Sequence, residues 1–77
     1  MNHNPIISVG KNIRTYRLKR GMTQVWLGRV VRKPNTWISK VENEKFVPSV
    51  QNIVRLAIAL KAPMSKIITW ERTEAPE

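Results

Sequence analysis

The sequence contains no cysteine and no aspartate, and its only histidine is His3. Without cysteine, disulfides and thiolate metal sites are excluded, and the chain is compatible with a reducing compartment. One histidine near the N-terminus cannot build a catalytic triad or a histidine–carboxylate metal cluster. The glycines, Gly10, Gly21 and Gly28, are too far apart for a phosphate-binding loop. We therefore predict a protein that is not an enzyme and that uses no metal or cofactor.

Long hydrophobic runs are also missing. Arg29 interrupts VWLGRVV and Arg55 interrupts IVRLAIAL, and neither stretch approaches the roughly 20 apolar residues that a membrane span needs. The N-terminal segment has no cationic region ahead of its short apolar run, which argues against a secretory signal. We expect one domain in these 77 residues, located in the cytoplasm and without a membrane partner.

Negative charge is scarce in the first half of the chain. Residues 1–41 contain no carboxylate, and residues 42–77 balance five cations against five carboxylates, so the whole net charge of +9 lies in the first half. Such an asymmetry indicates a polyanionic partner, nucleic acid more often than a membrane surface, although a basic half can also be only a solvated surface. The nine cations of residues 1–41 are Lys11, Arg14, Arg17, Lys19, Arg20, Arg29, Arg32, Lys33 and Lys40.

Apolar residues recur at helical spacing, and no stretch alternates with period two for long enough to propose a strand. Ser8, Thr23 and Ser49 can cap the first, second and fourth helices, and Pro34 suits the start of the third. Gly28 allows another helix to approach closely. The residues expected to face inward are Val9, Ile13 and Tyr16; Leu27 with Val30 or Val31; Ile38 and Val41; Val50, Ile53, Leu56, Ala57 and Leu60; and Met64, Ile67 and Ile68.

These patterns predict an all-α fold, a compact domain of five short helices joined by tight loops. We expect an N-terminal arm at residues 1–7, the helical domain at residues 8–70 and a disordered polar tail at residues 71–77. The composition, 42% hydrophobic and 25% charged, is that of a packed globular domain rather than a disordered chain.

The segment TQVWLGRVVRKPNTWISKVENEKFVPS resembles the Cro/lambda-repressor-type (XRE-like) helix-turn-helix DNA-binding family, and the resemblance covers about residues 8–68. It implies a lambda-repressor-like domain that contains a helix-turn-helix. Three positions depart from the family pattern: Arg32 stands where the turn usually has Gly, Lys33 replaces a small apolar residue and Gly28 replaces Ala. The matching residues are Gly10, Ile13, Arg14, Arg17, Gly21, Thr23, Gln24, Leu27, Ile38, Ser39, Val41, Glu42, Pro48 and Ser49.

In this family the outer face of the third helix enters the major groove of DNA. Asn can pair with adenine, Thr can meet a thymine methyl group and Lys can donate to guanine. The alternative is that these side chains are solvated or touch only phosphate. The resemblance therefore implies four base contacts, Asn35, Thr36, Ser39 and Lys40.

A second group of residues is expected to bind the DNA backbone. Gln24 matches the phosphate-contacting Gln of the family and stands at a helix N-terminus, which favours anions. Lys33, Asn43 and Lys45 flank the third helix and are candidate phosphate contacts. Trp37 can lie against the sugar-phosphate backbone, or it can pack on the rim of the domain.

Glu42, the first carboxylate of the chain, follows Val41 directly and shares a helical face with Ile38, at the border of the core. A carboxylate in that place needs a cation and further hydrogen bonds. The resemblance implies that Arg17 is this cation, so we interpret the pair as structural and not catalytic. Trp26 stands where the family usually has a polar residue, and both half-buried packing and contact with a partner are open to it.

We therefore predict a sequence-specific regulator of transcription, a repressor of prokaryotic or phage type that binds double-stranded DNA as a homodimer on a palindromic operator. Ile67, Ile68 and Trp70 cannot all face the core of one short helix, so we expect dimer contacts there. A second interpretation is the antitoxin of a toxin–antitoxin pair, which binds a partner protein as well as DNA. A third is charge-driven binding of nucleic acid or anionic lipid without sequence preference.

Overall fold

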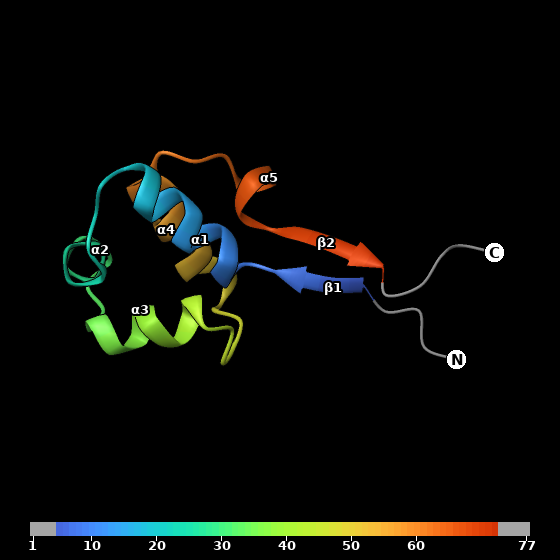
Figure 1. The fold of residues 1–77 in the computed structure, drawn as a ribbon, viewed down its shortest axis with the longest axis horizontal. Coiled ribbons are helices and arrows are strands. Elements are labelled where there is room, and N and C mark those ends of the chain that lie inside the picture. The colour runs from blue at the N-terminus through green and yellow to red at the C-terminus, as the bar shows by residue number, and fades with distance from the viewer. Residues whose placement is uncertain (1–4, 73–77) are drawn as a thin grey trace.

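The computed structural model describes residues 5–72, in which five helices pack around one core and two short strands project from the end opposite α2 (Figure 1). This agrees with the predicted fold of five helices. The elements are β1 (Pro5–Ser8), α1 (Gly10–Lys19), α2 (Gln24–Val31), α3 (Asn35–Glu42), α4 (Val50–Leu60), α5 (Met64–Ile67) and β2 (Thr69–Arg72).

Hydroxyl side chains mark the starts of α2 and α4, as the sequence predicts. The Thr23 hydroxyl accepts a hydrogen bond of 3.0 Å from the Trp26 amide, and the Ser49 hydroxyl accepts one of 3.3 Å from the Asn52 amide. Each bond satisfies one of the amides that a helix leaves free in its first turn. These two caps fix where α2 and α4 begin.

The expectation that the chain contains no strand is wrong. β1 and β2 form an antiparallel ribbon in which Ile7 is opposite Trp70 and Ser8 is opposite Thr69. Each strand has four residues, too few for a period-two pattern to be recognised. β2 also includes Glu71 and Arg72, which we assigned to a disordered tail; residues 73–77 lie outside the described part of the chain.

Ser8 does not cap the first helix, because it belongs to β1 and the capping position is held by Val9 without a side-chain hydrogen bond. Asn12, one turn into α1, ties the ribbon to the helices instead. Its amide nitrogen lies 3.0 Å from the Ser8 carbonyl oxygen, 2.9 Å from that of Ile67 and 2.9 Å from the Thr69 hydroxyl. One side chain therefore joins the base of both strands to α1.

The core gathers one apolar face from each helix. Of the two alternatives on α2, Val31 is buried and Val30 is exposed. Val50, which we placed on the inner face of α4, is 69% exposed because the helix begins at this residue, at the edge of the core. The buried apolar side chains are Val9, Ile13, Leu27, Val31, Ile38, Val41, Ile53, Leu56, Ala57, Leu60 and Ile67.

At Gly10, α1 closely approaches the end of α3. A Cβ built on Gly10 would lie 1.8 Å from the carbonyl oxygen of Val41, at the end of α3. Any side chain at this position would push the two helices apart, since backbone atoms cannot move aside as a flexible side chain can. The start of α1 thus sets the position of the end of α3.

Within residues 5–72, no helix has the length and apolar content required to cross a bilayer. The same part of the chain brings together no cluster of three or more side chains of the kinds that ligate metals.

Candidate nucleic-acid interface

The turn between α2 and α3 is tight because its backbone folds onto Gly28. A Cβ on Gly28 would lie 2.4 Å from the carbonyl oxygen of Lys33, and the Lys33 amide donates a 2.8 Å hydrogen bond to the Gly28 carbonyl. The prediction that Gly28 admits another helix is therefore wrong, since the neighbouring backbone is that of the turn itself. Arg32 ends α2 in the left-handed conformation, with a φ of 62°, where the family usually has Gly.

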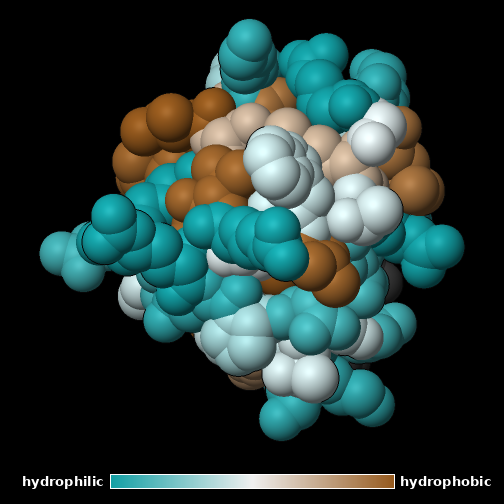
Figure 2. Space-filling view, turned by 90° about the vertical axis from the view of Figure 1, so that its left-hand side faces the viewer, coloured by the Kyte–Doolittle hydropathy of each residue, from teal (hydrophilic) through white to brown (hydrophobic). Residues whose placement is uncertain are grey.

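α3 presents a polar outer surface beyond this turn. Asn35, Thr36 and Lys40 are exposed, while Ser39 is half-buried and accepts a 3.3 Å hydrogen bond from the amide nitrogen of Asn43. At about 100° per residue these five side chains occupy one side of the helix. Figure 2, which looks onto the end of the molecule formed by α2 and α3, shows mostly hydrophilic side chains with apolar ones gathered in patches among them.

On the opposite side of α3, Glu42 forms a buried ion pair with Arg17 of α1. Nε of Arg17 donates to Oε2 of Glu42 at 2.6 Å, and Nη2 donates to Oε1 at 3.0 Å, so the contact is bidentate. Both residues are more than nine-tenths buried, with exposed fractions of 8% and 7%. Nη1 of Arg17 also donates to the carbonyl oxygen of Met22 at 2.8 Å. These bonds replace the water that both charges lose on burial.

Gln24 belongs to the same network. Its Nε2 donates to Oε1 of Glu42 at 3.1 Å, so the side chain expected at a phosphate is directed toward the ion pair. Its backbone amide lies at the start of α2, where free amides favour an anion. The network joins α1, the start of α2 and the end of α3, and it holds the two helices of the helix-turn-helix in one relative position.

Trp37 packs on the rim of the domain, which is one of the two interpretations of this residue. Its ring centroid lies 5.8 Å from that of Phe46, with the rings inclined at 62°. Nζ of Lys33 lies 5.2 Å from the centroid of the same indole, within range of a cation–π contact. Sequence reasoning missed Phe46, whose only signal is an aromatic residue just after the third helix. Lys33 and Trp37 therefore form one surface at the edge of α3.

Asn43 and Lys45 lie at the end of α3. Glu44 has a left-handed φ of 59°, and the Lys45 amide donates 2.9 Å back to the Lys40 carbonyl while the Glu44 amide donates 3.0 Å to that of Val41. This pattern is a Schellman motif, which closes the last turn of a helix. It holds Lys45, which is exposed, against the end of the helix whose outer face is polar.

The three residues expected to form dimer contacts have different environments in the structure. Ile67 has no exposed surface and is a core residue, so its assignment to a dimer contact is wrong. It fills the core because α5 packs against α1 and α4. Ile68 is half-buried and packs at the edge of the core. The backbone of Trp70 lies in β2, but its side chain is outside the described part of the structure.

Comparisons with known proteins agree with this geometry. The model of a helix-turn-helix family matches residues 13–67. A search of curated protein sequences gives no match. The DNA-binding domain of the P22 c2 repressor, residues 1–76, is 30% identical, with a TM-score of 0.74 over 87% of this chain and 84% of that one.

Two further structures are similar. The restriction-modification controller protein C.AhdI from Aeromonas hydrophila is 26% identical, with a TM-score of 0.71 over 75% of this chain and 84% of that one. The clp gene regulator ClgR from Corynebacterium glutamicum has the same fold at 22% identity, with a TM-score of 0.72 over 75% of this chain. The chain spans 62% of that ClgR protein, which is less than two thirds of its length.

Proposed function

The chain belongs to the XRE-type helix-turn-helix family of DNA-binding transcriptional regulators, and on this basis we propose that it binds a palindromic operator as a homodimer. One observation carries the proposal: a short helix, α3, is fixed to α1 by a buried ion pair and exposes polar side chains on its outer face. A rigid polar helix surface on a cationic chain is what the major groove accepts. The P22 c2 repressor has also been crystallised in complex with a synthetic operator, and it is 30% identical to this chain.

We assign different roles to the two groups of polar residues. Asn35, Thr36, Ser39 and Lys40 read bases, with Ser39 held in place by Asn43. The phosphate contacts are the backbone amide of Gln24 at the start of α2, Lys33 in the turn, and Asn43 and Lys45 after α3. Trp37 joins them, since it packs on the rim of the domain beside Lys33 and remains partly exposed. Phosphate contacts supply affinity and base contacts supply specificity, so the two groups should respond differently to substitution. Such a regulator acts in the cytoplasm, where its operator lies.

The homodimer requires a second surface, and the C-terminal segment is the candidate. Ile68 remains partly exposed there, and β2 has one edge that β1 does not pair. An unpaired strand edge can add a strand from a second copy, which gives an isologous contact. Sedimentation of the wild type and of Trp70→Ala tests this assignment: we expect a dimer that weakens in the variant, and a monomer both free and on DNA contradicts it.

Selection of DNA from a random pool tests the function as a whole. We expect enrichment of one inverted repeat whose half-sites lie about 10 bp apart, or a multiple of that spacing. Equal retention of all sequences would mean that charge alone holds the DNA. A single half-site without symmetry would leave sequence-specific binding in place and reject the homodimer.

The antitoxin function is the second candidate, and exposed apolar side chains favour it. Trp26 and Val30 on α2 and Ile58 on α4 are about half exposed or more, and they lie outside the surface proposed to bind DNA. Co-purification of a small toxin, together with release of that toxin by substitutions on α2 or α4, would identify this role.

A further inference from the structure

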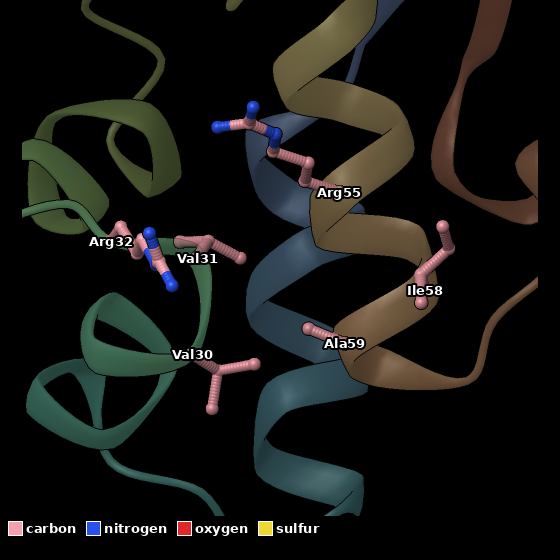
Figure 3. A pocket seen from close by; sticks show the side chains of 6 residues that line it. All are labelled: Val30, Val31, Arg32, Arg55, Ile58 and Ala59. Atoms are coloured by element: carbon pink, nitrogen blue, oxygen red, sulfur yellow. The ribbon is translucent and has the colours of Figure 1, made fainter.

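A hollow of about 390 Å³ lies between α2 and α4. In Figure 3, Arg55 lies at the top of the view and Val30 near the bottom, and Arg32 lies between them on the α2 side. None of the lining residues belongs to α3, so the hollow is separate from the surface proposed to read DNA. The lining residues are Val30, Val31 and Arg32 from the end of α2, and Arg55, Ile58 and Ala59 from α4.

Exposed apolar side chains surround the hollow. Ile58 is the most exposed large hydrophobic residue among those described, at 72%, and Val30 is about half exposed. Trp26 and Val54 each stand four residues earlier on the same helix and are also exposed. Residues four apart share a helix face, so each wall of the hollow continues as an apolar stripe. Contiguous apolar surfaces that stay exposed are the kind of surface at which proteins dock.

The charges at the hollow are of one sign. Both of its charged residues are arginines, and neither guanidinium forms an ion pair with any side chain that the structure describes. Arg32 also occupies a left-handed position that only Gly and a few short polar residues adopt readily. The side chain at this strained position lines the hollow, where it adds a second guanidinium to that of Arg55.

We propose that this hollow docks a segment of a partner protein that presents an apolar side chain flanked by carboxylates. Guanidinium groups bind carboxylates in a bidentate manner, and the apolar walls complement an aliphatic or aromatic anchor. A small molecule fits less well, because pockets for such ligands enclose most of the ligand surface whereas Ile58 here is largely open. Nucleic acid offers phosphates for the arginines but no partner for the apolar walls. The proposal does not depend on operator binding.

Selection from a displayed library of random peptides of about 16 residues, or about four helical turns, tests the proposal on the full chain. We expect the enriched peptides to combine at least two carboxylates with Leu, Ile, Phe or Trp. A synthetic copy of the most enriched peptide is then titrated against the wild type and the variants. Arg55→Gln and Ile58→Ala should each weaken its binding about tenfold, the loss expected for one charge-assisted hydrogen bond or one buried aliphatic side chain.

The chain provides matched controls for both substitutions. Arg29→Gln removes a cation from the exposed side of α2, and Val47→Ala shortens an exposed apolar side chain in the loop before α4; neither residue lines the hollow. Both control variants should bind the peptide within about twofold of the wild type, well below the tenfold loss of a direct contact. Thermal melting checks that all four variants are folded.

Three results would overturn the proposal. The first is no enrichment of any peptide, and the second is enrichment of peptides without carboxylates. The third is a peptide whose binding the variants and their controls weaken equally or not at all, since such a peptide binds elsewhere. A loss of operator binding by Arg55→Gln with unchanged peptide binding belongs to the third result, and it would assign Arg55 to DNA.

Discussion

Two exposed helix surfaces of this small domain differ in chemistry. The outer side of α3 carries Asn35, Thr36 and Lys40, with no large apolar side chain among them. The outer side of α4 instead carries Val50, Val54 and Ile58 at four-residue spacing. Exposure to water is favourable for the polar side chains of α3 and unfavourable for the apolar side chains of α4. The difference is consistent with the two proposals, because polar side chains suit the edges of bases and apolar ones suit another protein.

The largest expected difference between the two surfaces is their response to salt. If a dimer neutralises about six to ten phosphates, operator affinity should fall by roughly 10³–10⁵ between 50 and 200 mM salt, because counterions are released from DNA on binding. Peptide binding at the α2–α4 hollow involves two cations and an apolar contact, so it should fall far less. Parallel titrations by fluorescence anisotropy measure both, and equal slopes would remove the distinction.

The second prediction concerns the ion pair beneath α3. Arg17→Met or Glu42→Gln leaves one charge buried without its partner, which costs about 3–5 kcal/mol, much of the stability of a domain of this size. The double substitution should recover part of the loss, since both charges are then gone. A thermal double-mutant cycle followed by circular dichroism measures the coupling.

The same variants distinguish a global from a local role for the pair. If the whole domain unfolds, operator binding and peptide binding disappear together. Retention of peptide binding after loss of operator binding would mean that the pair only positions α3. Singles as stable as the wild type would contradict the structural interpretation of Glu42.

The third prediction separates the surfaces by substitution. Lys40→Ala or Thr36→Ala should weaken binding to the preferred operator by about 1–3 kcal/mol and relax the preference at one base position in each half-site. Peptide binding should be unchanged, because neither residue lines the hollow. Arg55→Gln should show the reverse pattern. Equal loss of Lys40→Ala on operator and on random DNA would make Lys40 a phosphate contact.

Local signals were sufficient to predict most of the fold. Thr23 and Ser49 cap helices as expected, and the helical spacing identified core residues such as Leu27 and Leu56. The ribbon was missed because the pairing of Ile7 with Trp70 joins residues at opposite ends of the chain, a contact that no local pattern encodes.

The candidate site was predicted less completely. Helical spacing and family resemblance identified the outer face of α3, but they could not show that Gln24 donates to Glu42. The hollow was not expected either. Spacing alone placed Val50 on the inner face of α4, and it could not choose between Val30 and Val31 on α2. Which apolar residue remains exposed depends on how the helices pack against one another, and this is a property of the tertiary structure.

The smallest effect that we predict comes from the two left-handed helix ends, Arg32 after α2 and Lys61 after α4. Their φ angles are 62° and 53°, and each costs a residue with a side chain about 1–2 kcal/mol relative to the usual conformation. Glycine removes this strain, but its greater freedom in the unfolded chain lowers the free energy of unfolding by about 0.4–1 kcal/mol. Arg32→Gly and Lys61→Gly should therefore both stabilise the domain by roughly 0.5–1 kcal/mol, measured by urea denaturation. Each also removes one positive charge, so their electrostatic effects on the fold are matched. Only Arg32→Gly should weaken the selected peptide, since Lys61 does not line the hollow. If both variants bind the peptide as the wild type does, the left-handed arginine is an ordinary helix end and the hollow depends on Arg55 alone.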